Sequence, residues 1–239
     1  MSDSIDNLSV TSRYQDGEYL KKNRDWHVEG SPWKALQIEK IINKNNLNLD
    51  SICEIGCGAG EILLQLSLNP KFNSVSFFGY EQSKIAFDLC KKRETESLKF
   101  YYENLLDKKI QYSAILCIDV FEHVENYMGF LKILKNRGKY KIFHIPLDLS
   151  VSSLLRGSII NSRDSVGHLH YFTPDIALAT LKDCGYEILD IMFTPSFRAE
   201  SPKSFKEKLA KIPRSFLYLI SPKLMSTLVG GASLMVLTK

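Results

Sequence analysis

The sequence predicts an α/β fold built on a seven-stranded, mostly parallel sheet with one antiparallel strand and helices on both faces. Short β-branched and aromatic runs alternate with helical patterns along the chain, which is typical of βαβ units. The last two expected strands are joined by a long connection in place of a plain crossover helix, which indicates the antiparallel strand. At 239 residues, the chain is long enough for one large domain with a complete core and short for two enzymatic domains.

The expected elements follow one another in a regular order. Strands are expected at 51–56, 74–81, 99–104, 112–119, 139–146, 186–195 and 232–238. Helices are expected at 34–42, 60–69, 83–94, 126–137 and 173–184, and the last of these has a Thr-Pro start and a glycine stop. Residues 147–172 are expected to form an irregular connection that covers a ligand, because connections of this length in a compact domain are usually functional.

Residues 1–48 are expected to form an N-terminal lid and helix, and residues 49–239 the main domain. Both tryptophans, Trp26 and Trp33, lie in this leading segment, beside a proline turn that precedes the expected helix. Two interpretations of the segment stay open. It forms a lid over a bound cofactor, or its helix packs across the sheet with Trp33 in the core.

Composition and cysteine usage narrow the class of protein. A hydrophobic fraction of 44% and a charged fraction of 24% are typical of a soluble globular chain. The first ten residues are polar and lack the basic and apolar regions of a secretory signal, so we expect a cytoplasmic location. The five cysteines form no CxxC pair, and no residues recur at a fixed ligand spacing. We therefore expect reduced thiols and no metal site.

Positive charge gathers in one late segment. The net charge is +4, and residues 198–223 hold seven basic and two acidic side chains, so the rest of the chain is close to neutral. A single basic segment does not predict a groove for nucleic acid, and we expect no nucleic-acid partner.

Apolar residues recur at helical spacing inside this basic segment, at Phe205, Leu209, Ile212 and Phe216. Residues 198–229 are therefore expected to be helical, with Pro213 splitting them into two short helices. The apolar side is expected to pack on the domain or on the partner of a homodimer. The alternative is peripheral contact with an anionic membrane surface.

A glycine-rich motif, Glu54-Ile55-Gly56-Cys57-Gly58-Ala59-Gly60-Glu61, is placed where an expected strand ends and a helix begins. Glycines there permit positive φ angles and let a ligand approach the backbone. A nicotinamide dinucleotide site also uses a glycine-rich turn, but its third glycine position is occupied here by Glu61. The alternative without a ligand is a tight turn with incidental glycines.

This motif resembles motif I of class I S-adenosylmethionine (SAM)-dependent methyltransferases of the small-molecule type, the ubiquinone-biosynthesis and sugar-methylating group. Four later segments agree with that family in order and spacing, at 79–83, 104–105, 118–124 and 167–174. The ordered set spans about 50–194. The resemblance implies a Rossmann-like fold and SAM as the cofactor.

The resemblance also implies which residues hold SAM. Glu81 is implied to hold the ribose hydroxyls, and its position at a strand end suits a cis-diol. Asn104 and Leu105 are implied to meet the adenine, although the family often has Asp where this chain has Asn104. The plain alternatives are a solvated acid for Glu81 and a helix N-cap for Asp119. The implied cofactor site comprises Glu54, Gly56, Gly58, Gly60, Glu81, Gln82, Asn104, Leu105, Asp119 and Val120.

Histidines fall where the acceptor is expected to bind. His123 lies just past the strand at 112–119, and His168 and His170 lie in the long connection. A histidine near neutral pKa suits the removal of a proton from an acceptor hydroxyl. His123 is therefore the first candidate for the general base, followed by His168 and His170.

The predicted function is methyl transfer from SAM to a small molecule, with a hydroxyl of a sugar, a phenol or a lipid-linked glycan as the expected acceptor. One alternative is a non-catalytic SAM-binding or scaffold protein with a methyltransferase fold. A nucleic-acid methyltransferase is less favoured, because the segment at 118–124 lacks an Asn/Asp-Pro-Pro-aromatic base clamp.

Overall fold

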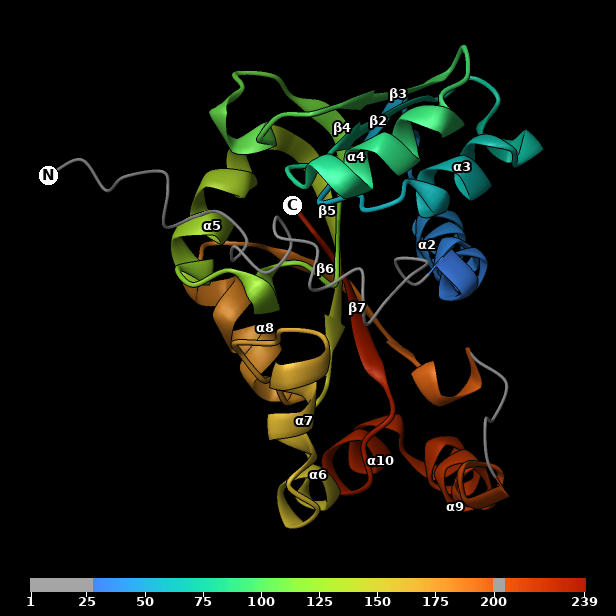
Figure 1. Ribbon diagram of the computed structural model, residues 1–239, viewed down its shortest axis with the longest axis vertical. Helices are drawn as coiled ribbons and strands as arrows, with labels where there is room; N and C mark the ends of the chain where they lie inside the picture. Colours follow the sequence, from blue (N-terminus) through green and yellow to red (C-terminus); the bar gives the residue numbers. More distant parts are fainter. Residues whose placement is uncertain (1–27, 200–204) are drawn as a thin grey trace, which may run out of the picture.

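The computed structural model describes residues 28–199 and 205–239, whose strands form one seven-stranded sheet (Figure 1). The strand order is β3-β2-β1-β4-β5-β7-β6. Pairs from β3 to β5 are parallel, whereas β7 is antiparallel to both β5 and β6. The predicted sheet with one antiparallel strand is confirmed. The strands are β1 (Ser51–Ile55), β2 (Ser76–Tyr80), β3 (Leu98–Tyr101), β4 (Tyr112–Ile118), β5 (Gly138–Pro146), β6 (Ile188–Thr194) and β7 (Ser233–Thr238).

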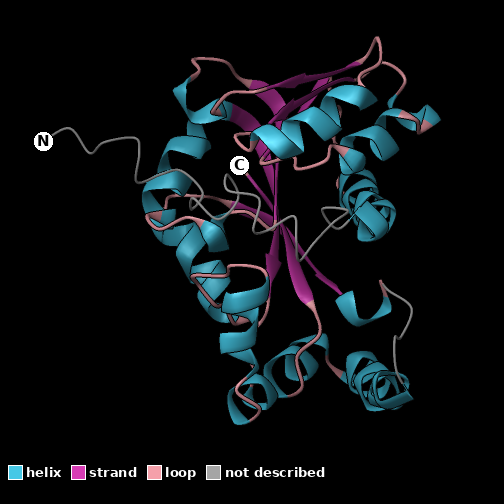
Figure 2. Ribbon diagram, in the orientation of Figure 1, coloured by secondary structure: helices cyan, strands magenta, loops and turns pink. Residues whose placement is uncertain are grey.

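Helices cover both faces of the sheet, as predicted (Figures 1 and 2). One face is covered by α5 (Tyr127–Leu134) and α8 (Pro174–Asp183), whose apolar side chains join one buried cluster with the strands. The other face is covered by α2 (Ser31–Lys44), α3 (Glu61–Ser67) and α4 (Lys84–Cys90), which contribute to a second cluster. Because both faces are covered, the central strands are buried on both sides.

The connection expected to be irregular, 147–172, contains two helices, so that expectation was wrong. They are α6 (Val151–Leu155) and α7 (Ser158–Ser165), separated by Gly157 at φ +64°. The α6 helix begins at a capping box in which Ser150 and Ser153 bond reciprocally, a serine variant of the usual glutamate pattern. The α7 helix buries none of its residues, so its sequence carries no amphipathic period.

The basic segment does not divide at Pro213 as predicted. One helix, α9 (Phe205–Ile220), runs through the proline, and α10 (Pro222–Leu228) follows a break at Ser221. Pro213 is exposed, so water can satisfy the backbone carbonyl that it leaves unpaired. The segments α6, α7, α9 and α10 gather at one end of the molecule (Figure 1). No helix in the described ranges is long and apolar enough to cross a bilayer.

The helix of the N-terminal segment packs across the sheet, in line with the second of the two interpretations. The α2 side chains of Ala35, Ile38, Ile41 and Ile42 are buried in the second cluster. Trp33 is only partly buried and its ring lies edge-on to His144. Residues 1–27, with Trp26 and His27, lie outside the described ranges, and the proposed lid there remains a prediction.

We expect Ile38→Ala to lower the free energy of unfolding by about 2 to 5 kcal/mol, because it leaves a cavity where α2 meets the sheet. Ile38 is fully buried, whereas Leu36 of the same helix is 54% exposed. Leu36→Ala is the matched control and should change stability by less than about 0.5 kcal/mol. Urea denaturation at pH 7 measures both, and an equal effect of the two substitutions would contradict the packing of α2.

Candidate functional site

A cavity of about 350 Å³ opens at the carboxyl ends of β1, β2 and β4. Open α/β sheets bind their ligands at this edge, where the first turns and loops after the strands converge. The cavity is lined by every residue predicted to hold the cofactor, namely Glu54, Gly56, Gly58, Gly60, Glu81, Gln82, Asn104, Leu105, Asp119 and Val120.

The glycine motif forms the turn between β1 and α3. Gly56, Gly58 and Gly60 have φ angles of +65°, +54° and +78°, in the left-handed region that favours glycine. A Cβ atom on Gly60 would lie 2.5 Å from Cζ of Phe100. The turn therefore needs glycine both for its backbone angles and for its close contact with β3.

Glu81 ties this turn to the next strand. Its carboxylate accepts hydrogen bonds from the backbone N–H groups of Gly58 at 2.8 Å, Gln82 at 2.9 Å and Ser83 at 2.7 Å. Burial raises the pKa of Glu81, and these N–H groups act in the opposite direction because they stabilise the carboxylate. The glycine turn and the end of β2 are thus held as one unit around the cavity.

Glu54 and Asn104 also line the cavity. Oε2 of Glu54 is buried and accepts no hydrogen bond from the described residues, and burial raises its pKa well above the usual value. A buried carboxyl oxygen without a partner inside a cavity fits a ligand that carries a hydrogen-bond donor. The amide oxygen of Asn104 accepts a hydrogen bond from the N–H of Leu106 at 3.0 Å, so it shapes the turn that carries Leu105.

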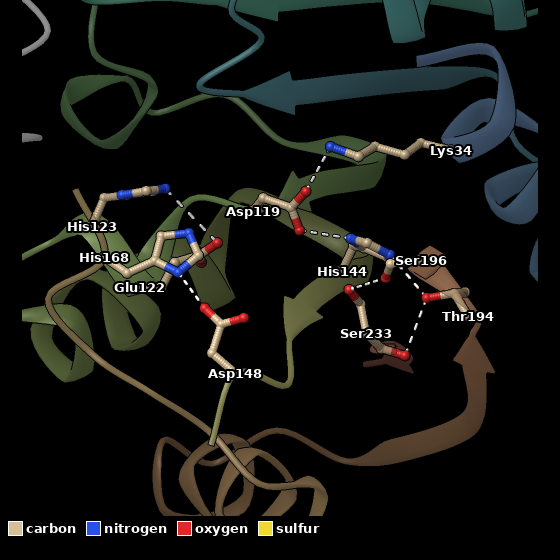
Figure 3. Close-up of polar contacts among 10 residues, drawn as sticks. All are labelled: Lys34, Asp119, Glu122, His123, His144, Asp148, His168, Thr194, Ser196 and Ser233. Carbon is tan, nitrogen blue, oxygen red and sulfur yellow. Dashed lines mark hydrogen bonds and ion pairs between the residues drawn. The ribbon is translucent and has the colours of Figure 1, made fainter. Parts of the chain in front are cut away.

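Asp119 lies just beyond β4, partly buried, and bonds two other side chains (Figure 3). Its Oδ2 accepts from Nζ of Lys34 at 2.6 Å, and its Oδ1 lies 2.6 Å from Nδ1 of His144. Burial alone would raise the pKa of Asp119, but Lys34 and His144 hold it well below its usual value. In return, Asp119 raises the pKa of Lys34 despite the burial of that side chain.

Sequence reasoning missed Lys34, because it lies 85 residues away from Asp119 in the chain. His144, the second partner of Asp119, lies on β5. Its Nε2 lies 2.9 Å from Oγ1 of Thr194, so both of its ring nitrogens are engaged. His144 therefore orients Asp119.

Two of the three predicted catalytic histidines meet at the cavity, and both line it (Figure 3). The rings of His123 and His168 lie 4.8 Å apart. Nδ1 of His168 is 2.5 Å from Oδ2 of Asp148, and Nδ1 of His123 is 3.1 Å from the carbonyl oxygen of Gly167. Both oxygens are acceptors, so each Nδ1 carries the hydrogen and each Nε2 carries the lone pair.

Burial shifts the pKa values of His123 and of its neighbour Glu122. Burial, together with the neighbouring His168, lowers the pKa of His123 to about 4, so its imidazole is neutral at pH 7. Burial and the negative charge of Asp119 raise the pKa of Glu122 well above its usual value. Both carboxyl oxygens of Glu122 are buried without a hydrogen-bond partner among the described residues, and one lies 3.9 Å from Nε2 of His123.

Glu122, His123 and His168 offer ligand atoms that all lie within 4.8 Å of one another. This donor set is one that a divalent cation could use. Glu122 and His123 follow β4, whereas His168 lies more than 40 residues later in the chain. A search of the sequence for closely spaced metal ligands therefore does not find this set. Asp148 was missed as well, although a carboxylate two residues after a parallel strand is a recognisable signal.

His170, the third predicted catalytic histidine, does not line the cavity. Its Nε2 bonds to the carbonyl oxygen of Val124 at 2.9 Å, and its ring packs on Tyr127 at 4.4 Å between centroids. The structure therefore gives His170 a packing role between η7 (Phe121–His123) and α5.

Comparisons with known proteins agree with this geometry. Residues 14–191 match the family model described as a methyltransferase domain. A ubiquinone biosynthesis O-methyltransferase from Rickettsia bellii is 32% identical over 108 residues, and the match spans 44% of this chain and 44% of that relative. The chain thus matches less than half the length of this curated relative.

Two solved structures show the same fold. Magnesium protoporphyrin IX methyltransferase from Synechocystis PCC 6803, with bound SAH, has a TM-score of 0.57 at 13% identity and covers 87% of this chain and 82% of its own. A possible histamine N-methyltransferase from Thermotoga maritima has a TM-score of 0.60 at 16% identity, with coverages of 96% and 100%. Because the family model matches residues 14–191, most of the chain, the chain belongs to the methyltransferase-domain family.

Proposed function

We propose that this protein methylates a hydroxyl group of a small acceptor, a sugar, a phenol or a glycan carried on a lipid. When bound, SAM supplies an activated methyl group on a sulfonium ion. The observation that carries the proposal is the Asp148–His168 pair, which presents an imidazole Nε2 to the cavity that holds the cofactor motif.

The residues of the cavity fit SAM. The turn from Gly56 to Gly60 lets a ligand approach the backbone, and Glu81 lies at the strand end that suits a ribose diol. The buried Oε2 of Glu54 can accept a hydrogen bond from the amino group of the cofactor. These side chains bind and orient the cofactor, and orientation contributes much of the rate acceleration in such transfers.

His168 serves as the general base in this proposal. Its Nδ1–H donates to Asp148, so its Nε2 can take the proton of an acceptor hydroxyl while Asp148 stabilises the imidazolium that results. His123, which was the first candidate from the sequence, is a neutral neighbour that positions the acceptor. Burial lowers the pKa of His123 to about 4, which makes its imidazole a weak base.

We expect Gly60→Ala to weaken SAM binding by at least about tenfold, because its Cβ would clash with Phe100 and its φ of +78° would be strained. Glu81→Ala should weaken binding about 10- to 100-fold, since charged hydrogen bonds are lost. Gly30→Ala is the matched control, because nothing lies within 4 Å of its Cβ position. Calorimetry with SAM measures all three, and tight NAD binding without SAM binding would refute the cofactor assignment.

We expect His168→Gln to slow methyl transfer about 10²- to 10⁴-fold with little change in SAM affinity, because the base is removed. His170→Gln is the matched control and should keep turnover, since His170 does not line the cavity. The assay follows methyl-labelled SAM into small molecules of a native extract by mass spectrometry. If His123→Gln alone abolished transfer, the base would be His123.

The non-catalytic alternative makes a different prediction in the same assay. A scaffold protein would bind SAM in calorimetry and transfer no label to any component of the extract. A nucleic-acid methyltransferase would place the label in the nucleic-acid fraction.

We also propose that the protein works in the cytoplasm at an anionic membrane surface. The apolar stripe of α9 is exposed, so the expectation that it packs on its own domain was wrong, whereas packing on a homodimer partner stays a prediction. Leu209, Ile212, Phe216, Leu219 and Ile220 are between 58% and 79% exposed. The stripe lies in the segment that carries the excess of positive charge, and an apolar stripe flanked by basic residues is typical of helices that lie on anionic bilayers.

We expect flotation with phosphatidylglycerol vesicles at low salt to carry the wild type, and Phe216→Glu to abolish it. Leu68→Glu is the matched control, because Leu68 is 65% exposed and Phe216 64%, on different parts of the molecule. Binding should weaken as salt rises, since charges at the surface are screened. Absence of flotation together with a dimeric mass in solution would instead assign the stripe to a homodimer interface.

A further inference from the structure

A second pocket, of about 120 Å³, lies between the α6–α7 segment and the α9–α10 segment. We call it the arginine pocket. Its polar lining includes Arg156, Arg214, Asp148 and four serines, with the backbone of Gly230 and Gly231 forming one wall. Neither arginine has a role in the methyl-transfer chemistry described above.

Arg214 is held in a partly dehydrated position. Its Nε is buried and donates no hydrogen bond to the described residues. A Cβ on Gly231, which has φ +90°, would lie 3.3 Å from this Nε, so glycine lets the guanidinium approach the backbone. Burial lowers the pKa of Arg214, and the positive charge of Arg156 adds to the effect.

No acid in the described ranges forms an ion pair with Arg156 or Arg214. The carboxylate that lines the arginine pocket, Asp148, is bonded to His168. Two like charges that face one pocket, one of them partly buried without a partner, are unfavourable. An anion bound between them would remove that penalty.

The start of α7 supplies neutral donors at the same place. The helix begins at Ser158 after Gly157, which provides no side-chain cap, and both Ser158 and Ile159 line the pocket. The first N–H groups of a helix lack intrahelical partners and favour negative charge. A guanidinium fork beside such N–H groups matches the tetrahedral oxygens of a phosphate.

Asp148 connects this pocket to the proposed base. Its carboxylate lines the arginine pocket and bonds His168, which lines the large cavity (Figure 3). We propose that the arginine pocket binds a phosphate group of the acceptor, as a monoester or a diphosphate, while the acceptor hydroxyl faces His168. The place of the hydroxyl rests on the proposed function, but the binding of phosphate does not.

The test measures binding of inorganic phosphate and of pyrophosphate by calorimetry, without SAM or acceptor. We expect both to bind the wild type, and Arg214→Met or Arg156→Met to weaken them about 10- to 100-fold. Lys92→Gln is the control, because it removes one exposed positive charge that lies outside the pocket. Unchanged SAM affinity in every variant shows that the fold is intact.

Absence of phosphate binding, or equal binding by the arginine variants, would overturn the proposal even if SAM binds. A membrane lipid also carries a phosphate, so the source is tested by competition. If phosphatidylglycerol vesicles leave pyrophosphate binding unchanged, the pocket serves the acceptor. Displacement of pyrophosphate by the vesicles would assign the pocket to a lipid headgroup and refute the acceptor site.

Discussion

The cavity is organised around the partly buried carboxylate of Asp119. A carboxylate can be buried only if cations and donors replace its water, and here Lys34 of α2 and His144 of β5 do so at 2.6 Å each. His144 reaches on to Thr194 at the end of β6, whose hydroxyl donates to the carbonyl of Ser233 on β7. The carboxylate of Asp119 thus links α2 to the antiparallel strands β6 and β7. These contacts lie beside the cavity and help to shape it.

Acidic side chains around this cavity take different charge states because their surroundings differ. Lys34 and His144 lower the pKa of Asp119, whereas burial raises the pKa values of Glu54 and Glu122. Neutral groups can be buried next to one another at little cost, which explains how Glu122 can lie beside His123. Asp148 is the carboxylate that bonds His168 directly, so its negative charge lies beside that ring.

The part of the site that was predictable from the sequence is the part built from local geometry. The glycine turn, Glu81 and Asn104 each follow a strand directly, and parallel strands bring their carboxyl ends to one edge. Lys34 and Asp148 were missed because their roles depend on distant contacts, with Asp119 and with His168. The helices α6 and α7 were missed because they are short and have few buried residues, so they lack a hydrophobic period.

The residues that local sequence patterns predict and those that they miss belong to different parts of the site. The residues implied to hold the cofactor follow β1 to β4, while the proposed acceptor residues His168, Arg156 and Arg214 come from segments after β5, where sequence patterns are weak. There the fold gathers two features on one helix, since α9 carries both Arg214 and the exposed apolar stripe with Phe216. Among the proposed acceptors, a glycan linked to a lipid through phosphate accounts for both features: its phosphate would meet the arginines while its lipid chain stays in the bilayer under α9. A free sugar or phenol accounts for neither.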